Sequence, residues 1–175
     1  MHPLVYDVAV SLDGYIAGPG GDVSRFAHEG AVVDDYLSRL AGYAVALMGR
    51  ETYEFGYRFG LAPGQNPYPH MRSVVISSQM SSGPGWAVEV WREIDASAIA
   101  ALKVEGPVYL CGGGALAGSL AKMGVIDLLR VKEAPALLGG GVPLFGPSHA
   151  APSLTCSDVR PYADGTVFRE FSVSA

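Results

Sequence analysis

The sequence contains few cysteines. Only Cys111 and Cys156 occur among 175 residues, and each lies in a stretch that reads as a β-strand. Two isolated thiols of this kind are more typical of core residues than of a disulfide or a metal-binding pair. We therefore expect a reduced, cytoplasmic protein whose two cysteines are buried, and no metal site.

Positive charge is also scarce. The chain has 12 Lys and Arg against 17 Asp and Glu, which gives a formal net charge of −5 and an isoelectric point near 5.3. Nucleic acids and acidic membrane surfaces attract basic patches, so neither is expected as the main partner. Any basic site must be local and built from one or two arginines.

The sequence has no long uninterrupted apolar run. The amino terminus, MHPLVYDVAV, lacks the basic region and continuous apolar stretch of a secretory signal. Residues 134–157 contain no Asp, Glu, Lys or Arg, but prolines and glycines interrupt this segment far short of the ~20 helical residues that cross a bilayer. We expect no membrane span.

What the chain does have is apolar content. Hydrophobic residues make up 49% of it and charged residues 17%, which indicates a substantial core rather than disorder. A chain of this length buries roughly two-thirds of its unfolded surface when it folds. Residues 1–175 are therefore predicted to form a single domain.

Hydrophobic periodicity predicts alternating strands and helices, and then two adjacent strands at the end. Ser11–Asp22, with four glycines and a proline, is predicted to be a flap over a site. The pattern indicates an α/β fold with a mainly parallel central sheet, an antiparallel C-terminal edge and helices on both faces. The expected strands are Leu4–Val10, Val45–Met48, Ser73–Ser77, Ala87–Trp91, Val108–Cys111, Asp127–Val131, Leu154–Val159 and Thr166–Val173, and the expected helices are Val32–Tyr43, Glu51–Phe55, Ala96–Lys103 and Ala115–Met123.

The most informative stretch is Val108–Leu120, which reads VYLCGGGALAGSL. An apolar strand runs into Gly112, Gly113 and Gly114 and then into a helix, so bare backbone and the helix amino end meet at one place. This arrangement is typical of a phosphate-binding turn. A tight strand-to-helix turn that needs glycine for geometry alone fits the same residues.

A second junction of this type lies upstream in Ala44–Glu54, AVALMGRETYE. Here a strand ends at Gly49 and Arg50, and Thr52 stands in the first turn of a helix. The guanidinium group of arginine suits phosphate oxygens. A surface turn is the simpler interpretation of this junction alone, but the two junctions together favour one nucleotide site.

The sequence resembles the dihydrofolate reductase-like superfamily. Within it, the chain is most similar to the C-terminal reductase domain of bifunctional riboflavin-biosynthesis deaminase-reductases and their stand-alone relatives. The segments that carry the resemblance occur in order along nearly the whole chain: AVSLDGYIAG at 9–18, MGRETYE at 48–54, VVISSQ at 74–79, VYLCGGGALAGSLAKMGVIDLL at 108–129 and LLGGGVPLFG at 137–146.

The resemblance implies an NADPH site. Ala9 and Ile16 match the positions that hold the nicotinamide carboxamide. Gly49, Arg50 and Thr52 match the phosphate-binding loop, with Arg50 facing the 2′-phosphate. The remaining matches are Ser77, Ser78 and Gln79 along the adenosine half and Gly112, Gly113 and Gly114 at the diphosphate turn, where the family has a cis Gly-Gly peptide bond.

The substrate side is less well defined by the sequence. Folate-reducing members place a carboxylate on the first helix, and Asp34 and Asp35 lie near that position, with Asp34 favoured; two solvated acids on the polar face fit equally well. Asp13 is either a second candidate acid or a turn former, and His28 and Glu29 either meet substrate or cap the helix. Further charges stand where related chains tend to have Thr, His or apolar residues, at Arg130, Lys132 and Glu133.

These observations predict an NADPH-dependent oxidoreductase that transfers hydride to a small heterocyclic substrate, pterin-like or ribosylamino-pyrimidine-like, or to a carbonyl compound. The alternative is a nucleotide-binding dimeric protein without catalytic activity. A Rossmann dehydrogenase is a third interpretation, but GGGALAG fits G-x-G-x-x-G poorly. Because residues 134–157 are rich in apolar side chains, we also expect a homodimer with Leu144 or Phe145 near its interface.

Overall fold

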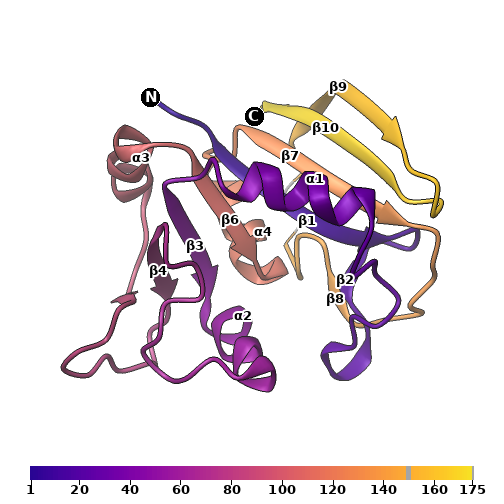
Figure 1. Ribbon diagram of the computed structural model, residues 1–175. Helices are drawn as coiled ribbons and strands as arrows, with labels where there is room; N and C mark the ends of the chain where they lie inside the picture. Colours follow the sequence, from indigo (N-terminus) through magenta and orange to yellow (C-terminus); the bar gives the residue numbers. More distant parts are fainter. Residues whose placement is uncertain (149–150, 175) are drawn as a thin grey trace.

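The computed structural model describes residues 1–148 and 151–174, which form an eight-stranded sheet and a small two-stranded sheet (Figure 1). Neighbouring strands from β5 to β7 are parallel, whereas β10 runs antiparallel to β7 and β9 antiparallel to β10. This confirms the predicted sheet. Its strands, in spatial order, are β5 (Glu89–Trp91), β4 (Arg72–Ile76), β3 (Val45–Gly49), β6 (Val108–Gly112), β1 (Leu4–Ser11), β7 (Leu128–Ala134), β10 (Val167–Ser174) and β9 (Ser153–Pro161).

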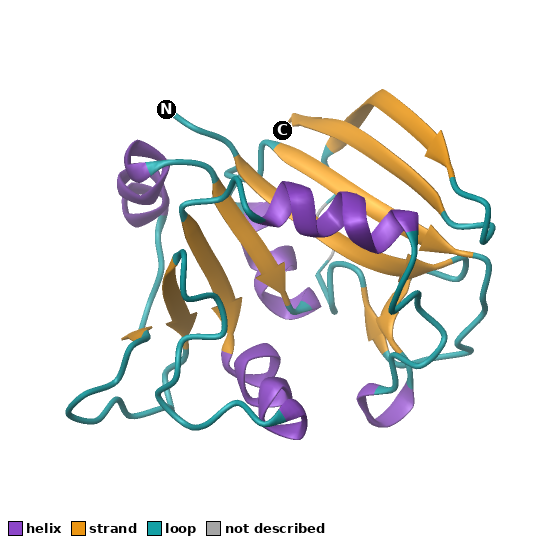
Figure 2. Cartoon of the chain, viewed as in Figure 1, coloured by secondary structure: helices purple, strands orange, loops and turns teal. Residues whose placement is uncertain are grey.

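The α-helices are α1 (Ala31–Leu40), α2 (Arg50–Phe55), α3 (Ala96–Glu105) and α4 (Gly114–Lys122), and Figure 2 shows them among the strands. Asp95 caps α3, since its Oδ1 accepts a hydrogen bond from the backbone N–H of Ala98 at 2.8 Å. Helix α1 ends three residues before the predicted boundary at Tyr43, and β5 begins two residues after the predicted start at Ala87. Two short 3₁₀ segments, Pro19–Gly21 and Gly56–Phe59, lie in stretches that were expected to be loop.

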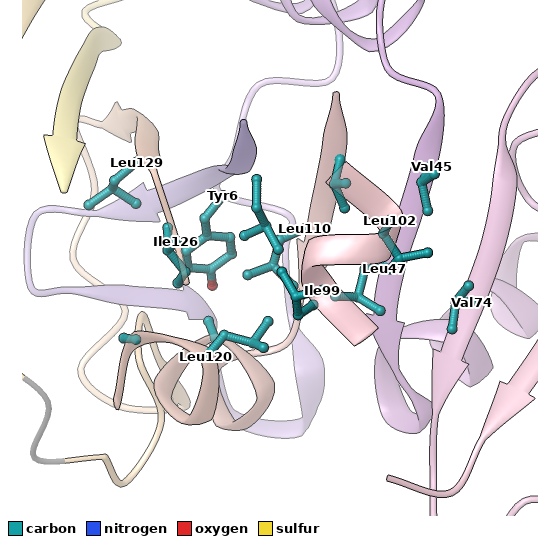
Figure 3. Packing of buried hydrophobic residues seen from close by; sticks show 14 of the residues in the cluster. Tyr6, Val45, Leu47, Val74, Ile99, Leu102, Leu110, Leu120, Ile126 and Leu129 are labelled. Atoms are coloured by element: carbon teal, nitrogen blue, oxygen red, sulfur yellow. The ribbon is translucent and has the colours of Figure 1, made fainter. Parts of the chain in front are cut away.

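The core has two halves, one on each face of the sheet. Successive residues of β1 alternate between them, because side chains on a strand point to opposite faces in turn. Leu4 and Tyr6 pack with α3 and α4, whereas Val5 packs on the face that α1 covers. Figure 3 shows the first half, in which Ile99, Leu102 and Leu120 lie against Tyr6, Leu47 and Leu110. Helices on both faces therefore bury the parallel strands, as expected.

A second, small sheet was not anticipated from the sequence. It pairs β2 (Tyr15–Ala17), inside the predicted flap, with β8 (Val142–Pro143), inside the late uncharged segment. Gly141 has a φ of +120°, and a Cβ there would lie 2.0 Å from the carbonyl oxygen of Ala17. Close backbone contact between the two segments thus depends on a residue without a side chain.

Two large side chains of the late uncharged segment, Leu144 and Phe145, pack against the core. The Tyr6 hydroxyl donates to the carbonyl oxygen of Leu144 at 2.9 Å, and the ring centroids of Tyr6 and Phe145 are 5.7 Å apart. Both late residues are half-buried against their own core, and their place near a dimer interface stays a prediction. Residues 149 and 150 of this segment lie outside the described residues.

The two cysteines differ in burial. Cys111 is half-buried at the end of β6, but Cys156 is exposed on β9. The prediction that both belong to the core is wrong for Cys156, because β9 is the edge strand and lacks a covering layer on its faces. Across the described ranges, no helix is long and apolar enough to cross a membrane.

Candidate functional site

The predicted cofactor residues gather at one edge of the sheet. Strands β4, β3 and β6 are adjacent and parallel, so their carboxyl ends meet on the same side (Figure 1). Ser77–Gln79 follow β4, Gly49–Thr52 end β3 and open α2, and Gly112–Gly114 end β6 and open α4. Ligands of open α/β sheets commonly bind outside the carboxyl ends of such strands.

The two glycine junctions lie side by side and leave their backbone uncovered. A Cβ added to Gly113 would meet one described atom within 4 Å, the Oγ1 of Thr52 at 3.2 Å. A Cβ on Gly49 would meet nothing nearer than the Gly113 nitrogen at 3.9 Å. The peptide between Gly112 and Gly113 is cis, as the resemblance implied. At this edge of the sheet, the backbone of Gly49 and Gly113 is therefore open to a ligand beside the hydroxyl of Thr52. We call this open backbone the cradle.

Gly114 has a different role from its two neighbours. A Cβ there would lie 2.2 Å from the carbonyl oxygen of Pro143 and 2.8 Å from the nitrogen of Gly146. Gly118, one turn further along α4, is as tightly covered, because a Cβ at that position would lie 2.3 Å from the Phe145 carbonyl oxygen. These two glycines let the late segment pack on α4, so the packing interpretation of the triple glycine holds for Gly114.

Arg50 stands at the first position of α2. Its Nη1 donates to Oε2 of Glu54 at 3.2 Å, and both side chains remain 37% exposed. Exposed pairs of this i,i+4 type contribute only ~0.3–0.5 kcal/mol. The guanidinium group can therefore leave Glu54 for a stronger anion at little cost.

The residues after β4 divide into buried and exposed positions. Ser77 is buried, and its hydroxyl accepts from the backbone N–H of Met80 at 2.8 Å and of Gln79 at 3.2 Å. Its side chain therefore holds the turn. Ser78 and Gln79 are exposed at the sheet edge and are the members of this group that a ligand can reach.

A cavity of about 350 Å³ lies next to this edge, between α1 and strands β1, β6 and β7. Ala9 lines it, whereas Ile16 lies on β2 and packs against the core. The lining is mainly apolar and aromatic, with a few polar groups deep inside and at the rim. Its residues are Asp7, Val8, Ala9, Phe26, Ala27, His28, Val32, Val33, Tyr36, Tyr109, Cys111, Lys132, Ala134 and Thr166.

Charged groups form the floor of this cavity. Asp7 on β1 has a side chain that is 0% exposed; its Oδ1 accepts from Lys132 Nζ at 2.5 Å and its Oδ2 from Arg39 Nε at 2.9 Å. Burial opposes ionisation of Asp7, but the two cations outweigh it and hold the pKa below its usual value. Burial lowers the pKa of Lys132 despite the neighbouring carboxylate. The floor is thus a desolvated ion cluster.

Phenols and a thiol adjoin this cluster. The hydroxyls of Tyr36 and Tyr109 are 2.7 Å apart, and the Tyr68 hydroxyl is 3.3 Å from Sγ of Cys111. Burial raises the pKa of Tyr36, Tyr109 and Cys111, so these groups are neutral at physiological pH. Lys132 Nζ lies 4.0 Å from the centre of the Tyr36 ring, which fixes the ammonium group by a cation–π contact.

The structure places neither Asp34 nor Asp35 in the cavity. Asp34 is exposed, and Asp35 accepts from the Tyr162 hydroxyl at 2.6 Å and from Arg160 Nη1 at 2.9 Å, which lower its pKa. Helix α1 instead turns Val32, Val33 and Tyr36 to the cavity, and Leu37 is 53% exposed. The helical spacing of Val33, Tyr36, Leu37 and Leu40 predicts a buried side that includes Leu37. That prediction is wrong for Leu37, because Val32 completes the buried side instead.

The other acids and the histidine also have defined places. Asp13 anchors the flap: it accepts from Ser11 Oγ at 2.5 Å and from the backbone N–H of Gly139 at 2.7 Å. His28 lies at the cavity rim, and Glu29 is exposed. The residue that precedes α1 is Gly30, with no side-chain capping bond, so His28 and Glu29 do not cap it.

Sequence reasoning missed Asp7 and Arg39 and noted Lys132 only as an unusual charge. The available signal was an acid inside an otherwise apolar strand, LVYDVAV. An ionised carboxylate buried on such a strand needs a cationic partner. The β1–β7 register supplies it, since Ala9 pairs with Lys132 and the side chain of Asp7 lies on the same face two residues away.

Comparison with known proteins gives one family. The family model of the RibD C-terminal domain matches residues 3–168 of this chain. Among curated proteins, the uncharacterised protein YwjB of Bacillus subtilis (strain 168) is 28% identical over 141 residues, which cover 79% of each chain.

Solved structures of similar fold include three whose names refer to riboflavin biosynthesis or to a pyrimidine or uracil reductase. A putative riboflavin biosynthesis protein from Shewanella sp. PV-4 superposes with a TM-score of 0.80 at 25% identity over the whole of both chains. A pyrimidine reductase-like protein from Corynebacterium diphtheriae gives 0.70 at 14% identity, covering 99% of this chain and 92% of that one. The Thermotoga maritima diaminohydroxyphosphoribosylaminopyrimidine deaminase/5-amino-6-(5-phosphoribosylamino)uracil reductase gives 0.68 at 18% identity, and the match covers 98% of this chain but 57% of that protein.

Proposed function

The chain belongs to the RibD C-terminal domain family, and on that basis we propose that it is a reductase that uses NADPH to reduce a small heterocyclic or carbonyl compound. Reductase names among the structural neighbours support the reaction type. The reduced nicotinamide supplies the hydride, so the protein has to bind, orient and exclude water.

The observation that carries the proposal is the bare main chain at Gly49, Gly112 and Gly113, next to a cavity. A diphosphate needs close approach to backbone N–H groups, and a Cβ on Gly113 would fill the space that this approach requires. Thr52 and Arg50 add a hydroxyl and a guanidinium group at the same edge. The residues present therefore fit a dinucleotide.

Other residues of the edge would hold the two ends of the cofactor. Ser78 and Gln79 are exposed beside β3 and would lie along the adenosine half. Ala9 lines the cavity and would hold the nicotinamide carboxamide with its backbone, together with Ile16 on β2. The cavity would then receive the substrate, and its apolar walls would keep water from the reacting atoms.

Titration of the purified protein with NADPH and NADH, followed by nicotinamide fluorescence, tests this proposal. A charge-assisted contact from Arg50 to the 2′-phosphate contributes roughly 1.5–3 kcal/mol, so NADPH should bind ~10–100-fold more tightly than NADH. Arg50→Ala should remove that preference. Arg160→Ala, an exposed arginine on β9 away from the edge, is the matched control and should keep it. Equal affinities for the two nucleotides in the wild type would refute the assignment of Arg50.

One observation fits the alternative function, a nucleotide-binding protein without catalytic activity. The carboxylate in the cavity, Asp7, is already neutralised by Lys132 and Arg39 and is not free to bind a substrate as an acid does. Tight NADPH binding without oxidation of NADPH across a panel of pterins, ribosylamino-pyrimidines and quinones would favour this alternative over the reductase.

A further inference from the structure

The polar floor of the cavity contains more hydrogen-bond donors than acceptors. A lysine ammonium has three N–H groups and an arginine has five, and neither can accept. Within the described ranges, the hydrogen bond of Lys132 goes to Asp7; behind the cavity lining, Nη2 of Arg39 is buried without any hydrogen-bond partner. Both oxygens of Asp7 are already engaged. An uncompensated surplus of donors remains.

Lys132 is the donor that a cavity ligand can reach. Its side chain lines the cavity and is 11% exposed, whereas Asp7 behind it is 0% exposed. The contact with the Tyr36 ring holds the ammonium group at the wall formed by α1. Donors that lack partners in a desolvated site favour a ligand that accepts hydrogen bonds.

We propose that Lys132 selects the substrate by binding an acceptor edge, an oxo oxygen or its enolate, on a planar ring. This proposal rests on the proposed reductase function and names its substrate class. A ring whose edge presents a protonated amidine, with N–H groups only, meets donors at Lys132 and finds no free carboxylate. The aromatic side chains of Tyr36, Tyr109 and Phe26 give such a ring apolar faces to pack against.

A site with Lys132 as its binding group differs from one that binds the substrate ring through a free carboxylate. A carboxylate on α1 would have pointed to an amidine, but the structure directs Asp34 and Asp35 away from the cavity. The cluster of one carboxylate and two cations instead carries a formal charge of +1. Specificity of this kind arises from unpaired donors that reject the wrong edge as well as from the bond to the right one.

The test uses the protein without cofactor and two probes of similar size. At pH 6, barbituric acid is a deprotonated planar trioxo ring that presents acceptors, and 2,4-diaminopyrimidine is protonated on a ring nitrogen and presents an amidinium edge of N–H donors. In ligand-observed NMR titrations, barbiturate should bind at least ~10-fold more tightly, the size of effect expected for one charge-assisted hydrogen bond. Equal binding of the two probes, or tighter binding of the diaminopyrimidine, would overturn the proposal.

Three variants locate the effect. Lys132→Met should lose at least ~10-fold in barbiturate affinity, and Lys132→Arg, which keeps a cation at this wall, should retain most of it. Lys103→Met is the matched control, because Lys103 is also 11% exposed and pairs with an aspartate, Asp127, outside the cavity. Circular dichroism verifies that each variant is folded. If Lys132→Met unfolds, loss of binding in Lys132→Arg together with unchanged binding in Lys103→Met would contradict the proposal.

The probe titrations can fail or succeed independently of the proposed reductase function. Because no nucleotide is present, selective barbiturate binding that depends on Lys132 supports the site even if NADPH fails to bind. Normal NADPH binding combined with no selectivity between the two probes would leave the reductase proposal standing and refute the role of Lys132.

Discussion

At the scale of single residues, two neighbouring glycines illustrate different reasons for lacking a side chain. Gly113 faces open space apart from the Thr52 hydroxyl, whereas Gly114 is pressed against the Pro143 carbonyl. The sequence shows both as members of one triple glycine and cannot distinguish them. The distinction depends on where the late uncharged segment packs in three dimensions.

Alanine substitutions at these two positions should therefore behave oppositely. Gly113→Ala should remain folded, because only a hydroxyl must shift by a few tenths of an ångström, yet its methyl group should abolish NADPH binding. Gly114→Ala should cost roughly 1–3 kcal/mol or more in unfolding free energy, because it overpacks a backbone contact. Urea denaturation and fluorescence titration measure the two effects. A Gly113→Ala protein that binds NADPH normally would contradict the cradle.

The ion-pair partners of Asp7 could not be predicted from its position in the sequence. Its position in an apolar strand was visible in the sequence, but its partners come from β7 and α1, which are distant in the chain. Only the strand register and the rotation of α1 bring Arg39 and Lys132 to it. The shared location of the glycines, Arg50 and Thr52 was easier to predict, because they lie at the carboxyl ends of strands or just after them.

At the scale of elements, the predicted alternation of strands and helices was confirmed, and the errors have physical causes. The periodicity located α1, but it assigned Leu37 rather than Val32 to the buried side, because both fit an amphipathic helix. The pairing of β2 with β8 was missed, since strands of two or three residues leave no periodic signal. The flap itself was expected, and Asp13 proves to be the residue that ties it to the late segment.

The flap anchor predicts a specific pH dependence. Hydrogen bonds from Ser11 and from the backbone of Leu138 and Gly139 lower the pKa of Asp13 to about 2. Since the folded pKa lies below the unfolded value of 3.8, the stabilisation is complete above pH ~4 and is lost as the pH falls towards 2. Asp13→Asn should reduce the unfolding free energy at pH 6, and its difference from wild type should shrink below pH ~4.

Urea denaturation at a series of pH values measures this dependence. Asp22→Asn provides a control on the same flap, because among the described residues the Asp22 carboxylate bonds to Ser24 of its own turn and not to the late segment. A difference between Asp13→Asn and wild type that stays constant from pH 6 to pH 2.5 would show that the carboxylate does not anchor the flap.

At the scale of the whole molecule, the sheet order determines where function can reside. Because β4, β3, β6 and β1 are adjacent and parallel, residues from four separate parts of the chain reach one edge. At one side of the sheet the outermost strand is β9, whose residues are exposed along almost the whole strand. An exposed edge strand of nine residues is a natural site for pairing with another chain.

We predict that the protein is a homodimer with β9 at its interface. Leu154 and Val159 on β9 are 45% and 55% exposed and would be covered by a second copy. Light scattering at micromolar concentration should give about twice 18.3 kDa. Val159→Glu should shift the mass to the monomer, and Val104→Glu, at another exposed site on α3, should leave it unchanged. A monomeric wild type would rule out the dimer.

The most direct test of the account is a titration of ¹⁵N-labelled protein with NADPH, followed through the backbone amide signals. The account predicts saturable shifts at Gly49, Thr52, Gly112, Gly113 and Ser78, which lie at the carboxyl ends of three different strands or just after them, with smaller changes at Ala9. Lys103 and the amides of β9 should not move. If these amides show no saturable shift, or if the shifts are confined to another part of the surface, the carboxyl ends of β4, β3 and β6 are not the cofactor site.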